Sequence, residues 1–253
     1  MSVRAVLIVL FLPMFAFAGS VENTQHLELA TRDIQSIYIA CGPGFLDVFG
    51  VEGDDSIKIS ATVSVNGITP DGLQEFLDKH TVLSLTKRHH RAVLQSGFIN
   101  ARLMKAEAKI DLTVTVPKTL KVKINDGSGP IFVTDLSTSL EIEDDSGSIE
   151  IRKVTGNLSV LDGSGEIEIR DIIGNIEIKD GSGPIRIERV RGNVRVTDAS
   201  GSMTIRDIDG NLTIMDDSGA IEVNDVTQNV YIEEAGSGIL DIEGVKGKVI
   251  KRK

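Results

Sequence analysis

The sequence predicts an all-β protein: a single-stranded parallel β-solenoid, or β-helix, with about 18 residues in each coil. Three observations predict this fold. A phrase that opens with Asp, with Ser and Gly two and three positions later, recurs every 18 residues over half of the chain without insertion or deletion. Aliphatic residues alternate with polar ones after each phrase, and a second turn containing Asn divides each period in two. A fixed period of this kind indicates stacked repeats, each too small to bury its own apolar face.

Two polar columns mark the predicted turns. The first-phrase Asp recurs at Asp126, Asp144, Asp162, Asp180, Asp198 and Asp216. The second-phrase Asn recurs at Asn157, Asn175, Asn193, Asn211 and Asn229. Asp, Ser and Asn bond their own backbone in turns, and Gly supplies positive φ. We therefore expect the Asp side chains to accept hydrogen bonds from turn N–H groups, with weak cation binding by the Asp column as the alternative. The stacked Asn side chains are expected to hydrogen-bond from coil to coil.

Period-two alternation of β-branched residues predicts two short strands per coil, each with one buried face. Parallel pairing of successive coils at about 4.8 Å would stack these residues into inward aliphatic ladders. The first-phrase ladder is Ile131, Ile149, Ile167, Ile185, Met203 and Ile221. The second-phrase ladder is Ile142, Val160, Ile178, Val196, Ile214 and Ile232, and a corner ladder is Leu136, Val154, Ile172, Val190, Ile208 and Val226. Stacking would stabilise each buried side chain by roughly 1.5–3 kcal/mol.

The first 26 residues are predicted to be a leader and a linker. Arg4, an apolar run over residues 5–15 and the small-x-small site at residues 16–18 predict a secretory signal peptide, residues 1–18. An uncleaved anchor helix is the alternative, although the apolar run is short for a membrane span. No Cys lies at the cleavage site, which argues against a lipid-anchored lipoprotein. Residues 19–26 are expected to form a polar linker.

Residues 27–125 are predicted to form irregular N-terminal coils that carry a short helical insertion near residues 70–79. Thr69 is positioned to cap this helix and Pro70 suits its first turn. Leu73, Phe76 and Leu77 give it one apolar face, so it could cover the exposed end of the sheets. Residues 126–253 are predicted to form the regular β-solenoid repeats.

The chain resembles the bacterial putative-adhesin family, a β-solenoid family catalogued as a domain of unknown function. The resemblance rests on the N-terminal signal, the irregular lead-in with a short helix, the stretch IDLTVTVPKTLKVKI, and the tandem SGxIxI…GNIxI coils, and it covers roughly residues 27–250. It implies the solenoid architecture and placement at the cell surface or envelope. It brings no catalytic residues to this chain.

Composition limits the partners. The chain has a net charge of −10, which argues against nucleic acid and anionic membranes as main partners. Its single cysteine, Cys41, excludes an intrachain disulfide. Alternation with Ile37 and Ile39 predicts a buried thiol, and a reactive or intermolecular thiol is the alternative. No stretch after the signal is apolar enough to cross a membrane.

Four chemical readings fail on the residues present, so we assign no catalytic, cofactor-binding or metal-binding residues. A calcium-binding β-roll carries its metal Asp where this chain has Ile, Leu, Val or Met. Two Asp-Ser-Gly triplets, residues 145–147 and 217–219, lie in repeat turns whose other copies lack that Asp, so they do not indicate an aspartic protease. No G-x-S-x-G motif supports a serine hydrolase, and His89 and His90 are expected in a solvated basic loop.

The sequence therefore predicts an exported, non-enzymatic scaffold or adhesin-like interaction module of the cell envelope, in the periplasm, secreted or at the cell surface. No cofactor is expected, and the partner would be an envelope protein or a surface partner that the sequence does not identify. A calcium-stabilised β-roll and a polysaccharide-active β-helix enzyme are the alternatives. The second would need carboxylates clustered in one cleft, and the scarcity of aromatic residues gives little support to a sugar-stacking platform.

Overall fold

The computed structural model describes residues 20–99 and 107–252, which fold into two compact units: residues 20–99 and 107–130 form unit 1, and residues 131–252 form unit 2. The predicted signal peptide, residues 1–18, lies outside the described residues.

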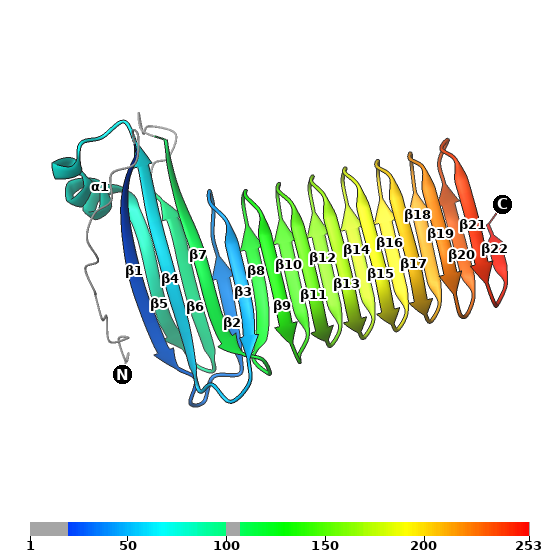
Figure 1. The fold of residues 1–253 in the computed structure, drawn as a ribbon, viewed down its shortest axis with the longest axis horizontal. Helices are drawn as coiled ribbons and strands as arrows, with labels where there is room; N and C mark the ends of the chain where they lie inside the picture. The colour runs from blue at the N-terminus through cyan, green and yellow to red at the C-terminus, as the bar shows by residue number, and fades with distance from the viewer. Residues whose placement is uncertain (1–19, 100–106, 253) are drawn as a thin grey trace. The chain divides into compact units, whose positions relative to one another are not determined.

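Unit 2 is a β-solenoid of two-strand coils (Figure 1). Its odd-numbered strands form one parallel sheet and its even-numbered strands form another, so that within residues 131–252 seven coils each give one strand to each sheet. The strands are β9 (Ile131–Leu136), β10 (Leu140–Asp144), β11 (Ile149–Thr155), β12 (Leu158–Asp162), β13 (Ile167–Ile173), β14 (Ile176–Asp180), β15 (Ile185–Arg191), β16 (Val194–Asp198), β17 (Met203–Asp209), β18 (Leu212–Asp216), β19 (Ile221–Val226), β20 (Val230–Ala235), β21 (Leu240–Val245) and β22 (Val249–Lys251).

The coils stack in the register that the sequence predicts. Ile149 lies opposite Ile167, and Asp144 lies opposite Asp162, an offset of one 18-residue period in each case. Every residue of the three predicted aliphatic ladders is buried. The predicted solenoid, its coil length and its parallel pairing are therefore confirmed.

One feature of the coil is not visible as alternation in the sequence: a bend inside the first-phrase strand. Ile149, Ile151 and Val154 are buried, so the inward spacing changes from two residues to three. Lys153, between the last two, has a φ of 53°, in the left-handed region. Its equivalents share this conformation in five further coils: Asp135, Asp171, Arg189, Asp207 and Asp225. The bend turns the chain so that both flanking aliphatic residues face the core.

The first-phrase turns stack too closely for side chains at the second Gly. Gly183 has a φ of 138°, and a Cβ built on it would lie 1.8 Å from the carbonyl oxygen of Gly165 in the preceding coil. Gly165 faces Gly147 in the same way, at 1.6 Å. Gly is required here because backbone lies directly against backbone.

Gly183→Ala should therefore lower the free energy of unfolding by about 2–4 kcal/mol, because it adds a backbone clash to an unfavourable φ. Gly127→Ala is the matched control, since a Cβ at Gly127 meets nothing within 4 Å. Thermal melting followed by far-UV circular dichroism would compare the two variants. Equal melting temperatures would contradict the close approach of the stacked turns.

Unit 1 is only partly coil-like. Its two sheets have the strand orders β1-β4-β7-β3 and β8-β2-β6-β5. The pairs β3/β7, β2/β8 and β2/β6 are parallel, as in a coil, whereas β1/β4, β4/β7 and β5/β6 are antiparallel. The strands are β1 (Ser20–Ala30), β2 (Ser36–Ala40), β3 (Leu46–Val51), β4 (Ser56–Asn66), β5 (Thr81–Arg88), β6 (Arg91–Phe98), β7 (Ala108–Pro117) and β8 (Lys121–Asp126).

The prediction of a polar linker over residues 19–26 is wrong for the described residues, because residues 20–30 form β1. This strand pairs with β4 along its whole length, from Ser20 opposite Asn66 to Ala30 opposite Ser56. Backbone pairing stabilises it although only Val21 and Leu27 are buried. Alternation of apolar residues was too weak there to indicate a strand.

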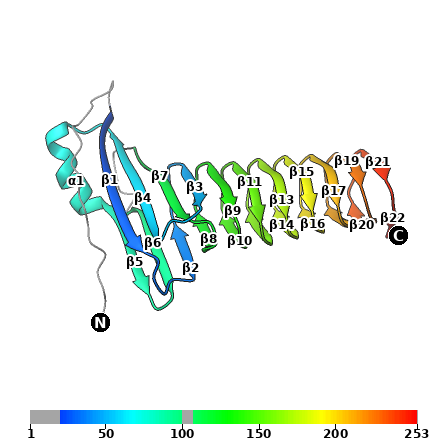
Figure 2. The same cartoon turned by 60° about the horizontal axis from the view of Figure 1, so that its bottom comes forward.

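The predicted helix is present, but it begins later than Thr69 and Pro70 suggest. Residues Pro70–Gly72 form a 3₁₀ turn, in which the Gly72 N–H donates to the Thr69 carbonyl at 3.0 Å. Helix α1 (Leu73–His80) follows, and the Thr69 side chain makes no capping hydrogen bond. The expected apolar face of α1 is buried, and the Phe76 ring lies 6.2 Å from that of Phe98 on β6. Figures 1 and 2 show α1 beside β1 and β5, the edge strands of this unit's sheets. Within the described residues, no helix has the length and hydrophobicity that crossing a bilayer requires.

Candidate interaction surfaces

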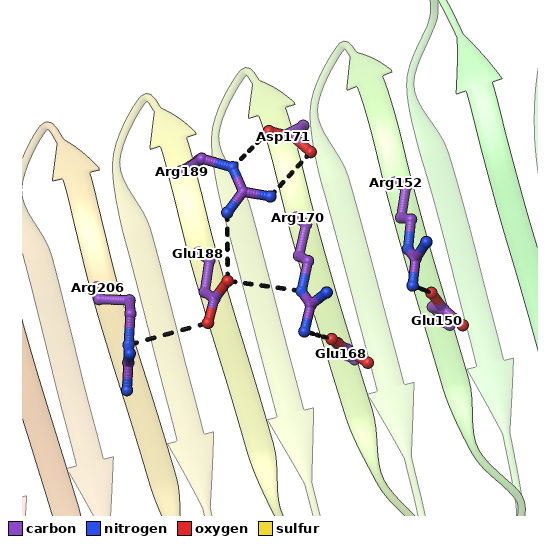
Figure 3. Close-up of polar contacts among 8 residues, drawn as sticks. All are labelled: Glu150, Arg152, Glu168, Arg170, Asp171, Glu188, Arg189 and Arg206. Atoms are coloured by element: carbon purple, nitrogen blue, oxygen red, sulfur yellow. Dashed lines mark hydrogen bonds and ion pairs between the residues drawn. The ribbon is translucent and has the colours of Figure 1, made fainter.

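The outer face of the odd-numbered strands of unit 2 carries a network of ion pairs (Figure 3). Glu188 lies at its centre and its side chain is only 14% exposed. Its carboxylate is 3.5 Å from Arg170 Nε, 3.2 Å from Arg189 Nη1 and 3.9 Å from Arg206 Nε. Arg170 also pairs with Glu168, and one coil earlier Arg152 pairs with Glu150 (Figure 3).

The network continues along the column of left-handed corner residues. Arg189 donates from Nε and Nη2 to the Asp171 carboxylate at 2.7 and 3.0 Å, and these bonds hold the pKa of Asp171 below its usual value. Lys153 lies 3.9 Å from Asp135 in the same column. Because these cations face carboxylates, this part of the surface is a solvated, salt-bridged face.

The Asn column is a hydrogen-bonded ladder inside the second-phrase turn. The Oδ1 atoms of Asn157, Asn175, Asn193 and Asn211 each accept the backbone N–H of the next Asn in the column, at 2.9–3.2 Å. The predicted coil-to-coil bonding is confirmed, and its donor is mainly the backbone. The ladder satisfies turn N–H groups that stacking would otherwise bury.

A groove of about 570 Å³ runs beside this ladder and is lined by residues from six consecutive coils. Its floor contains Leu140, Leu158, Ile176 and Val194 together with the Asn side chains. Its outer wall is the outward column of the even-numbered strands: Ser159, Glu177, Arg195, Thr213 and Tyr231. The five members of this column that line the groove are all of different residue types, whereas the structural columns repeat.

The Asp column accepts the predicted turn hydrogen bonds, but it lies in the core. Oδ1 of Asp162, Asp180, Asp198 and Asp216 accepts the N–H of the Ser two residues later, at 3.1–3.2 Å. These four residues are at most 7% exposed. Within the described residues, the second oxygen of each, Oδ2, is buried without a hydrogen-bond partner.

Burial changes the acidity of this column. Burial, with the charges of Asp162 and Asp198, raises the pKa of Asp180 to about 6. Burial and the charge of Asp216 likewise raise the pKa of Asp198 to about 6, and burial raises the pKa of Asp162 and Asp216 as well. The sequence did not show this, because a turn Asp is usually exposed.

The remaining candidates are not brought together. Asp145 and Asp217 are exposed in equivalent turns four coils apart, which is roughly 19 Å at the usual strand spacing, too far for a shared proton. Within residues 20–99 and 107–252, no group of three or more His, Cys, Asp or Glu side chains is arranged to hold a metal ion. Cys41, predicted to be buried, is only half-buried because β2 ends at Ala40 and releases the next residue from the core face.

His89 and His90 form the two-residue connection between β5 and β6, as the loop prediction requires. His90 Nδ1 lies 2.9 Å from the Asp33 carbonyl oxygen. Both imidazoles line a groove of about 580 Å³ on unit 1, together with Arg88 and Arg91. The sequence analysis did not predict this surface. The absence of Asp and Glu from residues 81–98, which contain Lys87, Arg88 and Arg91, indicates a locally basic surface and could have pointed to it.

Taken together, the fold is that of a β-solenoid built from 18-residue, two-strand coils. Residues 105–206 match the family model described as Toastrack DUF4097, and this match confirms the predicted resemblance to a β-solenoid family catalogued as a domain of unknown function. No curated protein matches the chain.

Solved structures that align with most of this chain come from several bacteria. A putative adhesin from Bacteroides fragilis NCTC 9343 is 13% identical, with 90% of this chain and 97% of that chain covered and a TM-score of 0.47. A putative lipid binding protein from Parabacteroides distasonis ATCC 8503 is 16% identical, with 91% and 97% covered and a TM-score of 0.43. A putative cell adhesion protein from Clostridium sporogenes ATCC 15579 is 9% identical, with 88% and 99% covered and a TM-score of 0.42.

Proposed function

We propose that this chain is exported and acts as a non-enzymatic scaffold or adhesin-like interaction module of the cell envelope. The observation that carries the proposal is the groove along the even-numbered strands of unit 2. An elongated groove spanning six coils suits an extended partner, because each coil adds one more set of contacts at a fixed spacing. The signal-like residues 1–18 support export.

The side chains that maintain the fold of unit 2 are different from those that line the groove, and this separation supports a binding role. The repeated Asp, Asn and Gly residues serve the turns, and the aliphatic ladders fill the core. The outward column is free of these duties and varies from Ser159 to Tyr231. A repeated frame that carries a varied outer column can present a surface specific to one partner.

Filling the groove should weaken binding to the envelope without unfolding the chain. Thr213→Arg would project a long side chain into the groove, whereas Thr204→Arg places the same change on the opposite sheet, where Thr204 also faces outward. We expect at least about tenfold weaker retention on envelope preparations for the first variant, equivalent to about 1.4 kcal/mol, and little change for the second. Equal losses would show that the groove is not the binding surface.

Export has its own test. N-terminal sequencing of protein recovered from the envelope fraction should begin near Gly19. An intact Met1 terminus on protein confined to the cytoplasm would contradict the proposed function.

A further inference from the structure

The groove of about 580 Å³ on unit 1, lined by His89 and His90, lies beside a row of cations that crosses one sheet of this unit. Lys121 on β8 lies opposite Ser36 on β2, Ser36 lies opposite Arg91 on β6, and Arg91 lies opposite Arg88 on β5. Segments far apart in the sequence thus place three cations in one line, which we call the basic row (Lys121, Arg91, Arg88). All three are exposed. The row spans three strand spacings, roughly 14 Å.

Within the described residues, no carboxylate pairs with the basic row; the Asp33 carboxylate faces Lys87 instead, 4.0 Å from its Nζ. The strand segments that carry it, residues 36–40, 81–98 and 121–125, contain no Asp or Glu, although the chain as a whole has a net charge of −10. Among the described residues, neither Lys121 nor Arg88 nor Arg91 forms an ion pair. In unit 2, by comparison, Arg170, Arg189 and Arg206 face carboxylates, whereas Arg186 and Arg191 form no ion pair among the described residues.

Stability does not account for the row. Arg88 and Arg91 are directly opposite each other in an antiparallel pair, a position in which like charges are destabilising. An anion bound between them would reverse the sign of that contribution. The hollow of about 580 Å³ beside them offers further hydrogen-bonding groups from Gln35, Tyr38 and Gln95.

We propose that the basic row and its groove bind an acidic polysaccharide, a chain whose sugars carry carboxylates. The row is too long for one small anion to contact all three cations, whereas a polymer can place successive carboxylates along it. The amide and phenol groups of the groove can hydrogen-bond sugar hydroxyls. A bilayer surface fits less well because it is flat and cannot enter a hollow. A duplex nucleic acid has a much higher charge density, which the overall negative charge of the chain opposes.

This inference names a partner class for the proposed interaction module and rests on that proposal. Its test is direct binding of a fluorescein-labelled polygalacturonate oligosaccharide to the purified protein, measured by fluorescence anisotropy at low salt. The variant Arg88→Gln/Arg91→Gln should bind about tenfold more weakly than the unmodified protein, since two charge-assisted contacts are lost. The control Arg186→Gln/Arg191→Gln removes the same charge from two exposed residues of unit 2 that form no ion pair among the described residues, and should change binding less than about twofold.

A melting curve shows that the first variant is folded: its melting temperature should equal or exceed that of the unmodified protein, because the like-charge pair is removed. Competition with unlabelled polygalacturonate should displace the probe, and neutral dextran should not. Equal losses in both double variants would overturn the proposal in favour of non-specific attraction. A competitor that displaces the probe at lower concentration than unlabelled polygalacturonate would also overturn the proposal. Polyglutamate in that role would indicate an acidic protein, inorganic phosphate a small anion, and anionic phospholipid vesicles a membrane. An exported protein that ignores polygalacturonate would refute this inference and leave the proposed function standing.

Discussion

A chain that lacks residues 162–170 should lose the cooperative unfolding of unit 2, whereas a chain that lacks residues 162–179 should keep it. The shorter deletion removes one phrase and puts residue 171 after residue 161. Ile172 would then occupy the position of Gly163, where even a Cβ lies 2.5 Å from the Asp145 carbonyl oxygen. All later strands would also move to the other sheet, so the corner ladder would break.

The longer deletion removes one complete coil. Asp180 then follows residue 161 and takes the place of Asp162, which is its partner in register. Each ladder closes with another aliphatic residue, and stability should fall only by the nearest-neighbour contribution of one coil. Melting curves of the two deletions beside the intact protein would decide. Equal unfolding of both would show that the two-phrase coil is not the structural unit.

Asp198→Asn should stabilise the protein at neutral pH and lose this advantage in acid. The pKa of Asp198 is raised from 3.8 to about 6 in the folded state, so the folded chain binds more protons than the unfolded chain between about pH 4 and pH 6. The free energy of unfolding therefore rises as pH falls through this window, and above it the ionised side chain destabilises the fold. A shift of this size corresponds to about 3 kcal/mol, which sets the upper limit of the gain.

The amide suits this site. Its oxygen can still accept the Ser200 N–H, and its nitrogen can donate toward the buried Oδ2 of Asp180 or Asp216, which have no partner in the described residues. We expect a gain of about 1–3 kcal/mol at pH 7.5 and almost none at pH 4, from denaturant unfolding at both values. Glu177→Gln, on an exposed position of a neighbouring coil, is the control and should change little at either pH. A gain that persists unchanged at pH 4 would show that ionisation of the column is not its cause.

The core of unit 2 was predictable because its signal is strictly periodic. Ile149, Ile167 and Ile185 recur with no insertion, and parallel pairing then leaves one register that keeps them together. The turn bonds of Asp180 and Asn175 were predictable for the same reason, since each residue type has a known local bond.

What the sequence could not show depends on packing or on distant segments. Asp198 is a polar residue, so nothing in the sequence indicated that stacking would bury it. Lys153 was not expected in the left-handed region, because Lys does not favour that backbone conformation. β1 was missed because its stability comes from pairing with β4. The basic row was missed because residues 36, 88, 91 and 121 meet only once strands β2, β5, β6 and β8 align.

The near-identical coils of unit 2 also determine how it would respond to tension. Each coil is joined to the next by the same small set of strand, turn and Asn bonds, so the links along the stack are close to equal in strength. A force applied along the stack would be carried by these links in series, and the end coil would detach first because it has a neighbour on only one side. One detached coil of 18 residues releases roughly 60 Å of extended chain. Such a domain would lengthen in regular steps under load and keep its remaining coils intact, so that mechanical work is absorbed one coil at a time.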